Sequence, residues 1–506
     1  MLVKIASAAL HGIEAYPVEV EVDICPGFPT FVTVGLPDAA VRESKERVRA
    51  ALKNCGYDMD SKRITVNLAP ADRRKEGSAF DLPIALGFLA FLEVVAPERL
   101  RDYLFAGELA LDGRLKPVRG ALPIALMARR SGFRGVVVPG ANAREAALVR
   151  DLEVYALEDL IRVVRLLREP GDVPPCRFDE RELVAASVYA VDFEDVKGQQ
   201  HVKRALEVAA AGAHNVLLVG PPGAGKTMLA RRLPTILPDM SYDEMLEVTR
   251  VYSAAGLLAG AGTVNTRPFR APHHTVTDAG LIGGGIVPKP GEVSLAHHGL
   301  LFLDELPEFK RKVLEDLRTP VEDGQVTVAR SGYSVTFPAA FMLVAAMNPC
   351  ADVRRGLLGK TADCTESEKA RYYSKISGPL LDRIDIQLDV PAVKFGEIVS
   401  RAPAECSAAI RARVARARAR QAARFAGRKI FANAQMGPKE TKEFCRLPAE
   451  AERLLEMAVT KLGFSARAFD RVLKVARTIA DLEGSDGIET AHVSEAVQYR
   501  MMDRLR

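Results

Sequence analysis

The sequence has no apolar run long enough to cross a bilayer. Its most apolar stretch, residues 80–96, is interrupted by Asp81, Pro83 and Glu93, whereas a membrane helix needs about 20 predominantly apolar residues. The first residues, MLVKIASAALHGIEAY, also lack the apolar segment and cleavage site of a signal peptide. We therefore expect residues 80–96 to form a buried helix, and the protein to be cytoplasmic with no membrane partner.

Cysteine and net charge are both scarce. The seven cysteines are odd in number and show no paired CxxC spacing, so neither a disulfide framework nor a cysteine metal site is visible. We expect free thiols in a reducing compartment. The net charge is only +5 over 506 residues, which permits nucleic-acid binding without indicating it, so any basic surface must be local.

The length predicts several domains, and the pattern of residues changes along the chain. Residues 1–170 alternate β-rich runs with helical patterns, which predicts an α/β domain. The prolines and acids around residues 171–190 indicate a linker. Residues 191–394 alternate apolar runs, acidic or glycine-rich turns and helices, which predicts a parallel sheet with helices on both faces. Residues 395–506 predict a helical domain.

A glycine-rich motif follows the apolar run 215–219 and precedes a helical pattern. A phosphate-binding loop forms where a strand turns tightly into a helix N-terminus. There, Lys226 would supply positive charge and Thr227 a hydroxyl for Mg²⁺. The alternative, a glycine turn with an incidental lysine, is disfavoured by the flanking strand and helix. The expected ATP contacts are Gly220, Pro221, Pro222, Gly223, Ala224, Gly225, Lys226, Thr227 and Met228.

Two further apolar runs end in polar residues. The run 300–303 ends in Asp304 and Glu305, where one carboxylate can hold the Mg²⁺ water shell and the next can polarise an attacking water. The run 341–346 leads to Asn348, whose amide is placed to orient that water or touch the γ-phosphate. An Asn-Pro turn is the alternative for Asn348.

These motifs together resemble the AAA+ ATPases. Longer segments, including RPFRAPHHTVTDAGLIGGG and SGPLLDRIDI, resemble the ComM (YifB) family, a magnesium-chelatase-like branch, and the resemblance covers nearly the whole chain. It implies ATP and Mg²⁺ as ligands and a ring, usually a hexamer, with ATP sites between subunits. It makes Asn348 the sensor-1 residue, Arg383 an arginine finger acting on the neighbour's nucleotide, and Arg467 sensor 2. For the two arginines an ion pair is the alternative, with Asp382 or Asp385 as the partner of Arg383.

Residues 1–170 resemble the proteolytic domain of Lon-type proteases. Ser78 lies near the place of the Lon serine, but Leu122 stands where the lysine is expected. A Ser–Lys dyad needs an amine to take the serine proton. We therefore expect a Lon-like fold without protease chemistry, with Ser78 a turn residue or helix cap.

Two groups of residues are candidates for DNA contact. Residues 322–337 predict a β-hairpin whose tip carries Arg330 and Tyr333, which suit phosphate and base contacts. Arg73 and Arg74, next to Lys75, form a basic cluster. An ordinary surface hairpin and a solvated loop are the respective alternatives.

Two other patterns suggest ligands less directly. The segment 409–424 is helical and has six arginines and no acid. It predicts either a phosphate-binding rod or a solvated helix. The adjacent histidines 273–274 and 297–298 would point to opposite faces of a strand, so we expect hydrogen-bonding or structural roles for them.

A zinc site is not expected. Relatives of the ComM family often carry a cysteine-rich loop after the sensor strand, but here that loop has only Cys350 and Cys364. Two thiolates are too few for a four-ligand structural zinc site.

The resemblance implies a DNA motor that drives branch migration of three- and four-stranded DNA during natural transformation. Branched DNA and other copies of the chain would be its partners. One alternative is a magnesium-chelatase-type ATPase that remodels a protein client. The other is an ATP-dependent Lon-like protease, against which the missing lysine argues.

Overall fold

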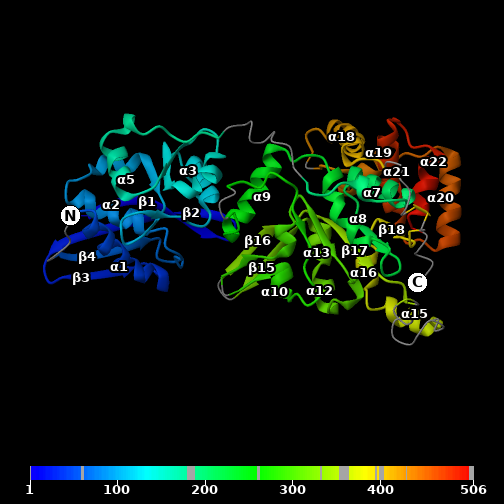
Figure 1. The fold of residues 1–506 in the computed structure, drawn as a ribbon, viewed down its shortest axis with the longest axis horizontal. Helices are drawn as coiled ribbons and strands as arrows, with labels where there is room; N and C mark the ends of the chain where they lie inside the picture. The colour runs from blue at the N-terminus through cyan, green and yellow to red at the C-terminus, as the bar shows by residue number, and fades with distance from the viewer. Residues whose placement is uncertain are drawn as a thin grey trace. The chain divides into compact units, whose positions relative to one another are not determined.

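The computed structural model describes residues 2–57, 62–178, 189–258, 262–285, 287–330, 333–350, 352, 364–393, 396–397, 404–428 and 430–500 (Figure 1). The chain divides into two compact units. Unit 1 comprises Met1–Ala186, Ser241–Asn265 and Pro288–Pro290, and unit 2 comprises Ser187–Met240, Thr266–Val287 and Gly291–Arg506. The first boundary falls within the predicted linker. Across the described residues, none of the helices has both the length and the apolar character needed to cross a membrane.

Unit 1 contains a four-stranded sheet with strand order β1-β2-β4-β3 and a three-stranded parallel sheet with order β5-β8-β9. Buried and exposed residues alternate along β2 and β4, as expected for strands with one face on a core. The strands of unit 1 are β1 (Leu2–His11), β2 (Glu14–Pro26), β3 (Thr30–Val34), β4 (Lys62–Ala69), β5 (Tyr103–Phe105), β6 (Glu108–Leu109), β7 (Leu115–Lys116), β8 (Gly135–Pro139), β9 (Glu153–Leu157) and β13 (Lys289–Pro290).

The helices of unit 1 are α1 (Ala39–Asn54), α2 (Asp81–Phe91), α3 (Ala121–Arg130), α4 (Ala143–Ala147), α5 (Leu160–Arg168) and α9 (Tyr242–Ala255). Helix α2 is buried over nearly its whole length, which confirms the buried helix predicted within residues 80–96. Its one carboxylate, Asp81, is compensated by Arg47, whose Nε lies 2.6 Å from Oδ2.

Helix α9 lies in unit 1, although the sequence analysis placed it in the central domain, residues 191–394. The Gly120 N–H donates to the carbonyl of Ser253 at 3.1 Å, and the Ser253 hydroxyl donates to the buried Glu145. The guanidinium of Arg150 lies 4.2 Å from the centre of the Tyr242 ring. The helical pattern of these residues identifies the element but not the core on which it packs.

Unit 2 is built on a five-stranded parallel sheet with order β11-β14-β17-β10-β18. Strands β10, β14 and β17 are buried at every position, because helices cover both faces of such a sheet. The predicted parallel sheet is therefore confirmed. The strands are β10 (Val216–Val219), β11 (Phe269–Arg270), β14 (Leu300–Leu303), β17 (Met342–Met347) and β18 (Ile386–Asp389), with the short β12 (Gly283–Gly284) and a hairpin of β15 (Gln325–Arg330) and β16 (Tyr333–Pro338) outside the sheet.

The helices of residues 395–506 share one hydrophobic core with the sheet and belong to unit 2 rather than to a unit of their own. Helices α18 and α21 both pack on α7. The helices of unit 2 are α7 (Gln200–Gly212), α8 (Lys226–Arg232), α10 (Asp278–Ile282), α11 (Glu292–Leu295), α12 (Arg311–Asp316), α13 (Arg318–Asp323), α15 (Glu366–Tyr373), α16 (Gly378–Leu381), α18 (Ser407–Arg424), α19 (Pro438–Phe444), α20 (Ala449–Leu462), α21 (Ala466–Glu483) and α22 (Thr490–Gln498).

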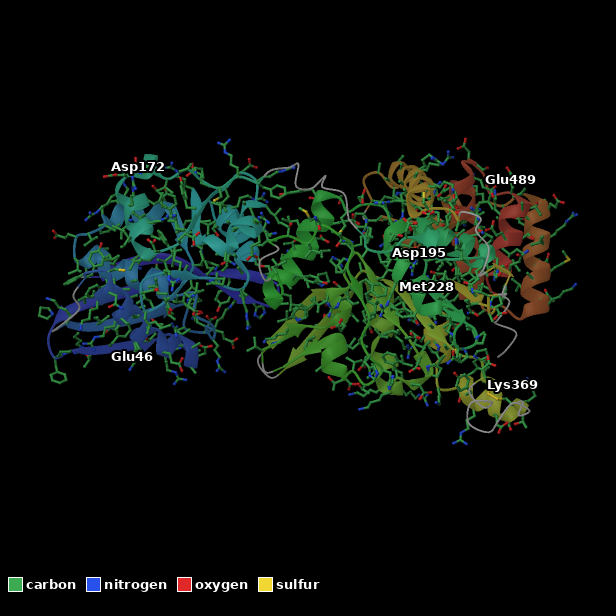
Figure 2. All side chains as sticks on the ribbon, in the orientation of Figure 1. Glu46, Asp172, Asp195, Met228, Lys369 and Glu489 are labelled. Carbon is green, nitrogen blue, oxygen red and sulfur yellow. A yellow bond between two sulfur atoms is a disulfide. The ribbon has the colours of Figure 1, made fainter. Side chains whose placement is uncertain are left out.

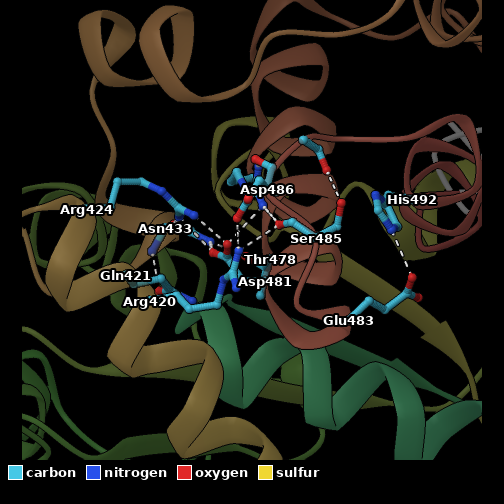
Figure 3. A network of polar contacts seen from close by, with 12 residues as sticks. Arg420, Gln421, Arg424, Asn433, Thr478, Asp481, Glu483, Ser485, Asp486 and His492 are labelled. Carbon is cyan, nitrogen blue, oxygen red and sulfur yellow. Dashed lines mark hydrogen bonds and ion pairs between the residues drawn. The ribbon is translucent and has the colours of Figure 1, made fainter.

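Several arginines of α18 bind other parts of unit 2. Arg424 Nη1 donates to Asp481 Oδ2 at 2.8 Å, and Arg420 Nη2 donates to Asp486 Oδ1 at 2.5 Å (Figure 3). Arg413 pairs with Glu207 and Glu405. These arginines are therefore held by acids from other segments, whereas Arg416 of the same helix is exposed.

Candidate nucleotide site

The glycine-rich loop connects the end of β10 to the start of α8. Gly223 and Gly225 have φ angles of 78° and 86°, a region that side chains disfavour and glycine adopts freely. Gly220 is needed for a different reason, since a Cβ there would lie 2.1 Å from the carbonyl oxygen of Val390. The loop therefore turns tightly at the C-terminal edge of the sheet and directs the N-terminus of α8 toward it.

Lys226 is nearly buried, and its amine has three acceptors. Its Nζ donates to the carbonyls of Gly220 and Pro221, at 2.6 and 2.9 Å, and to Oδ1 of Asn348 at 2.9 Å. Burial lowers the pKa of Lys226, and nearby carboxylates, foremost Asp304, oppose that effect. Two residues predicted from separate motifs are thus in direct contact at the ends of the adjacent strands β10 and β17.

Thr227 and Asp304 meet beside the loop. The Thr227 hydroxyl donates to Oδ2 of Asp304 at 2.7 Å, and the Glu305 N–H donates to Oδ1 of the same carboxylate at 3.0 Å. A hydroxyl and a carboxylate at one point are hard oxygen ligands of the kind that Mg²⁺ binds. The residues present therefore fit a magnesium ion held next to bound phosphates.

Glu305 has a left-handed backbone conformation with φ of 53°, and its side chain is 56% exposed. Its Oε2 lies 3.5 Å from Nδ1 of His274. Both residues line a pocket of about 280 Å³ together with Thr227, His273 and Asp304. The carboxylate is free to approach a solvent molecule in this pocket, which is what activating an attacking water requires.

The predicted hydrogen-bonding role is confirmed for the side chains of two of the paired histidines, His273 and His297. His273 Nδ1 lies 2.9 Å from the Thr275 hydroxyl, and His297 Nδ1 accepts the Ala340 N–H at 3.1 Å. At His298 it is the backbone that bonds, because its carbonyl accepts from Arg267 Nη1 at 2.7 Å.

Gln199 supports the loop, and the sequence analysis did not identify it. Its Nε2 donates to the carbonyls of Ala224 and Pro391, both at 2.9 Å, so it ties the loop to the segment after β18. A single glutamine before a helix gives no signal in the sequence for this role. Met228, on the first turn of α8, is partly exposed beside the loop (Figure 2).

Arg383 is 8% exposed and is held within its own chain. Its Nη1 donates to the carbonyl of Pro379 at 2.7 Å, and its Nη2 forms an ion pair with Glu322. An ion pair was the alternative weighed for Arg383, but the partner is neither Asp382 nor Asp385. Asp385 instead forms an ion pair with Arg471, whose Nη1 lies 2.8 Å from Oδ1.

Arg467 lies on the first turn of α21 and is exposed. The hydroxyl of the preceding Ser465 caps this helix by accepting the Ala468 N–H at 3.2 Å. Burial lowers the pKa of Arg383, and the positive charge of Arg467 lowers it further.

The predicted hairpin is confirmed, with β15 and β16 antiparallel and Arg330 opposite Tyr333 at its end. The side chains of these two residues lie outside the described part of the structure. In unit 1, the Arg73 guanidinium lies 5.0 Å from the centre of the Tyr16 ring, and Arg74 lies 3.9 Å from Glu76.

Lys75 does not belong to a surface basic cluster. It is completely buried, its amine donates to the carbonyl of Pro70, and burial lowers its pKa. Close by in sequence, the Ser78 hydroxyl donates to the carboxylate of Glu108. Leu122 is fully buried in α3. Ser78 therefore has an acid, not an amine, as its hydrogen-bond partner.

The expectation that the cysteines are free thiols is wrong for two of them. Cys350 and Cys364 form a disulfide with their Cα atoms 6.4 Å apart. Both follow the strand that carries Asn348, and their separation of 14 residues has no CxxC pattern by which a pair is recognised. Neither sulfur is a free thiolate able to bind zinc.

Three family models match the chain. A model described as magnesium chelatase, subunit ChlI, matches residues 192–398, one described as subunit ChlI of Mg-chelatase matches residues 20–142, and one for the ChlI C-terminal region matches residues 404–500. Competence protein ComM of Haemophilus influenzae is 44% identical over 508 aligned residues, which cover 100% of this chain and 98% of that protein.

The chain belongs to the ComM/YifB family. A protein named YifB from Escherichia coli is also 44% identical, with 98% of this chain and 96% of that protein covered. By contrast, the magnesium-chelatase 67 kDa subunit of Chlorobaculum parvum is 29% identical over 34% of this chain and 25% of its own length. ComM/YifB relatives match the chain throughout, whereas similarity to this magnesium-chelatase subunit covers about a third of it.

Proposed function

We propose that this ComM/YifB-family protein is a ring-forming ATPase that moves branch points in three- and four-stranded DNA during recombination of incoming strands. The observation that carries the proposal is the convergence of Lys226, Asn348, Thr227 and Asp304 through hydrogen bonds of 2.7–2.9 Å. Four residues from three strand ends form the charge, amide and oxygen set that a magnesium nucleotide needs.

In this proposal, ATP binds on the loop of residues 220–225 with its phosphates at the N-terminus of α8. Lys226 contributes positive charge to the phosphates, and Thr227 and Asp304 hold Mg²⁺, which neutralises charge on the β- and γ-phosphates. Glu305 accepts a proton from the attacking water, and Asn348 orients that water. Replacing Glu305 is therefore expected to abolish ATP hydrolysis and to leave ATP binding intact.

The ring would place each ATP site beside a neighbouring subunit, whose Arg383 and Arg467 stabilise charge that develops at the γ-phosphate. We infer six subunits from the family. The hairpin residues Arg330 and Tyr333, together with Arg73 and Arg74, would contact DNA. The Haemophilus relative is named a competence protein, which supports a role in natural transformation, in the cytoplasm where incoming DNA is recombined.

The test is ATP-dependent dissociation of a labelled synthetic Holliday junction by the wild type and by Glu305→Gln. The wild type should separate the junction, and the variant should bind it without separating it. ATPase rates with and without DNA are measured in parallel. If the protein hydrolyses ATP but neither binds DNA nor is stimulated by it, the branch-migration proposal is overturned. The favoured substrate would then be a protein client, as for a chelatase-type ATPase. A casein digestion assay with Ser78→Ala tests the protease alternative directly.

A further inference from the structure

Arg383 is withdrawn into its own subunit. Its side chain is 9% exposed, its Nη1 is bound to the Pro379 carbonyl and its Nη2 to the Glu322 carboxylate. Within the described residues its Nε is buried without a hydrogen-bond partner. A guanidinium buried and paired in this way is not available to a nucleotide outside its own chain, and acting on one would require these contacts to open.

Glu322 is the acid that compensates Arg383 in this position. Burial lowers the pKa of Arg383, and the nearby arginines 318, 467 and 471 lower it further. Asp385, two residues further along the chain than Arg383, is already engaged by Arg471 at 2.8 Å and by the backbone N–H of Asn215 at 3.0 Å. Removing the charge of Glu322 would therefore leave Arg383 among cations, and that disfavours its buried position.

Glu322 also lies at the base of the hairpin. It is in the last turn of α13, which ends at a left-handed Gly324 with φ of 65°, and β15 begins at the next residue. The Gly324 carbonyl accepts the Ala339 N–H from the far strand's end at 2.8 Å. The end of α13 thus continues directly into β15 and is hydrogen-bonded, through Gly324, to the residue after β16. A displacement of the hairpin would therefore displace the Glu322 carboxylate.

We propose that Glu322 is a positioning residue that holds Arg383 in a withdrawn state, and that Arg383 serves a neighbouring ATP site only after this ion pair opens. The inference rests on the proposed role of Arg383 in hydrolysis. In this inference the position of the hairpin controls whether Arg383 can act in hydrolysis, because Glu322 lies three residues before the start of β15. DNA engaged by the hairpin would then favour hydrolysis by favouring release of Arg383.

The test compares DNA-free ATPase rates of Glu322→Gln, Glu322→Asp and Asp323→Asn. Glu322→Gln keeps the shape and removes the charge, and should raise the DNA-free kcat roughly threefold to tenfold by increasing the released population of Arg383. Glu322→Asp keeps the negative charge on a shorter side chain and should give a smaller rise in the DNA-free kcat. Asp323→Asn removes the same charge from the adjacent exposed position and should leave the rate unchanged.

Two further variants separate this inference from the proposed function. Arg383→Ala should abolish hydrolysis, and Glu322→Gln combined with Arg383→Ala should be equally inactive, since the gain depends on the arginine. If Arg383→Ala is inactive while neither Glu322 variant exceeds the wild-type rate, the inference is overturned and the proposed role of Arg383 stands. If Arg383→Ala hydrolyses ATP at the wild-type rate, the proposed role of Arg383 falls, and the inference with it.

Discussion

The amine of Lys226 donates a hydrogen bond to the side-chain oxygen of Asn348, 2.9 Å away and 122 residues further along the chain. The contact joins the phosphate-binding loop to the end of β17, the strand next to β10 in the sheet. Because the Lys226 amine also binds two loop carbonyls, it is oriented within the loop. A phosphate that binds the Lys226 amine would therefore lie next to the side chain of Asn348.

Asn348→Ala should lower kcat for ATP hydrolysis by about 10²-fold, because a preorganised polar group at a reacting phosphate contributes roughly that amount. ATP affinity should change much less, since Lys226 keeps its two loop acceptors. Steady-state phosphate release and binding of a fluorescent ATP analogue give the two quantities. Equal losses in affinity and turnover would show that Asn348 supports the loop rather than the reaction.

Glu305→Gln should lower kcat by about 10²- to 10⁴-fold, the usual contribution of a general base, with nucleotide binding retained. The matched control is Glu308→Gln, three residues further on, where the carboxylate pairs with Lys375 at 3.2 Å on the surface. That control should hydrolyse ATP as the wild type does. Similar losses in both variants would argue against Glu305 as the base.

Thr227→Val should raise the Mg²⁺ concentration needed for half-maximal ATPase activity, because it removes the hydroxyl bound to Asp304 at 2.7 Å and keeps the shape of the side chain. Thr227→Ser retains the hydroxyl and should restore the wild-type requirement. Titration of the ATPase rate with Mg²⁺ at fixed ATP measures the effect. An unchanged Mg²⁺ requirement in Thr227→Val would exclude the hydroxyl as a ligand.

His214 should make folding stability depend on pH below neutrality. It is fully buried, its Nε2 lies 2.8 Å from the Thr478 hydroxyl, and its Nδ1 lies 3.4 Å from Asp385. Burial lowers the pKa of His214, and the hydrogen bond that the ring makes to the Asp385 carboxylate opposes this effect. The unfolded chain, with a histidine pKa of about 6.5, therefore binds a proton that the folded chain does not.

The free energy of unfolding should consequently fall as the pH decreases below about 6.5, by up to about 1.4 kcal/mol per pH unit from this one group. His214→Gln should remove this part of the slope, although the variant is less stable at neutral pH. The exposed His201 gives the control His201→Gln, which should leave the slope intact. Urea unfolding at pH 7.5, 6.5 and 5.5 measures it, and an unchanged slope in His214→Gln would contradict the assignment.

The disulfide predicts a thiol count. Denatured, unreduced protein should react at five cysteines, namely Cys25, Cys55, Cys176, Cys406 and Cys445, and reduced protein at all seven. Peptide mapping should find Cys350 joined to Cys364. Seven reactive thiols without reduction would show that the pair is reduced in solution.

The confirmed parts of the sequence analysis rest on local patterns. The glycine spacing before Lys226 specifies a strand-to-helix turn because only that backbone brings its N–H groups together. The hairpin of β15 and β16 follows from two alternating runs separated by Ser331 and Gly332. Each depends on residues close together in the chain, and each can be predicted without knowing the rest of the fold.

Partners distant in sequence could not be predicted. The acid paired with Arg383 is Glu322, 61 residues earlier, while the nearer Asp385 binds Arg471 and His214. Lys75 looked like a surface cation beside Arg73 and Arg74, but it is completely buried. The sequence suggests ion pairs between charged residues that are close along the chain. Burial and packing in the folded protein decide which charged residues actually meet.

The sequence by itself determined the chemistry available to this protein: a phosphate-binding loop, an acidic strand end, an asparagine strand end and membership of a family. The tertiary structure alone decided that α9 packs in unit 1, that Arg413, Arg420 and Arg424 of α18 are ion-paired, and that Arg383 is withdrawn. The physical reason is that motifs are fixed by backbone geometry over a few residues. The partner and exposure of a charged side chain depend instead on which distant segments the folded core brings beside it.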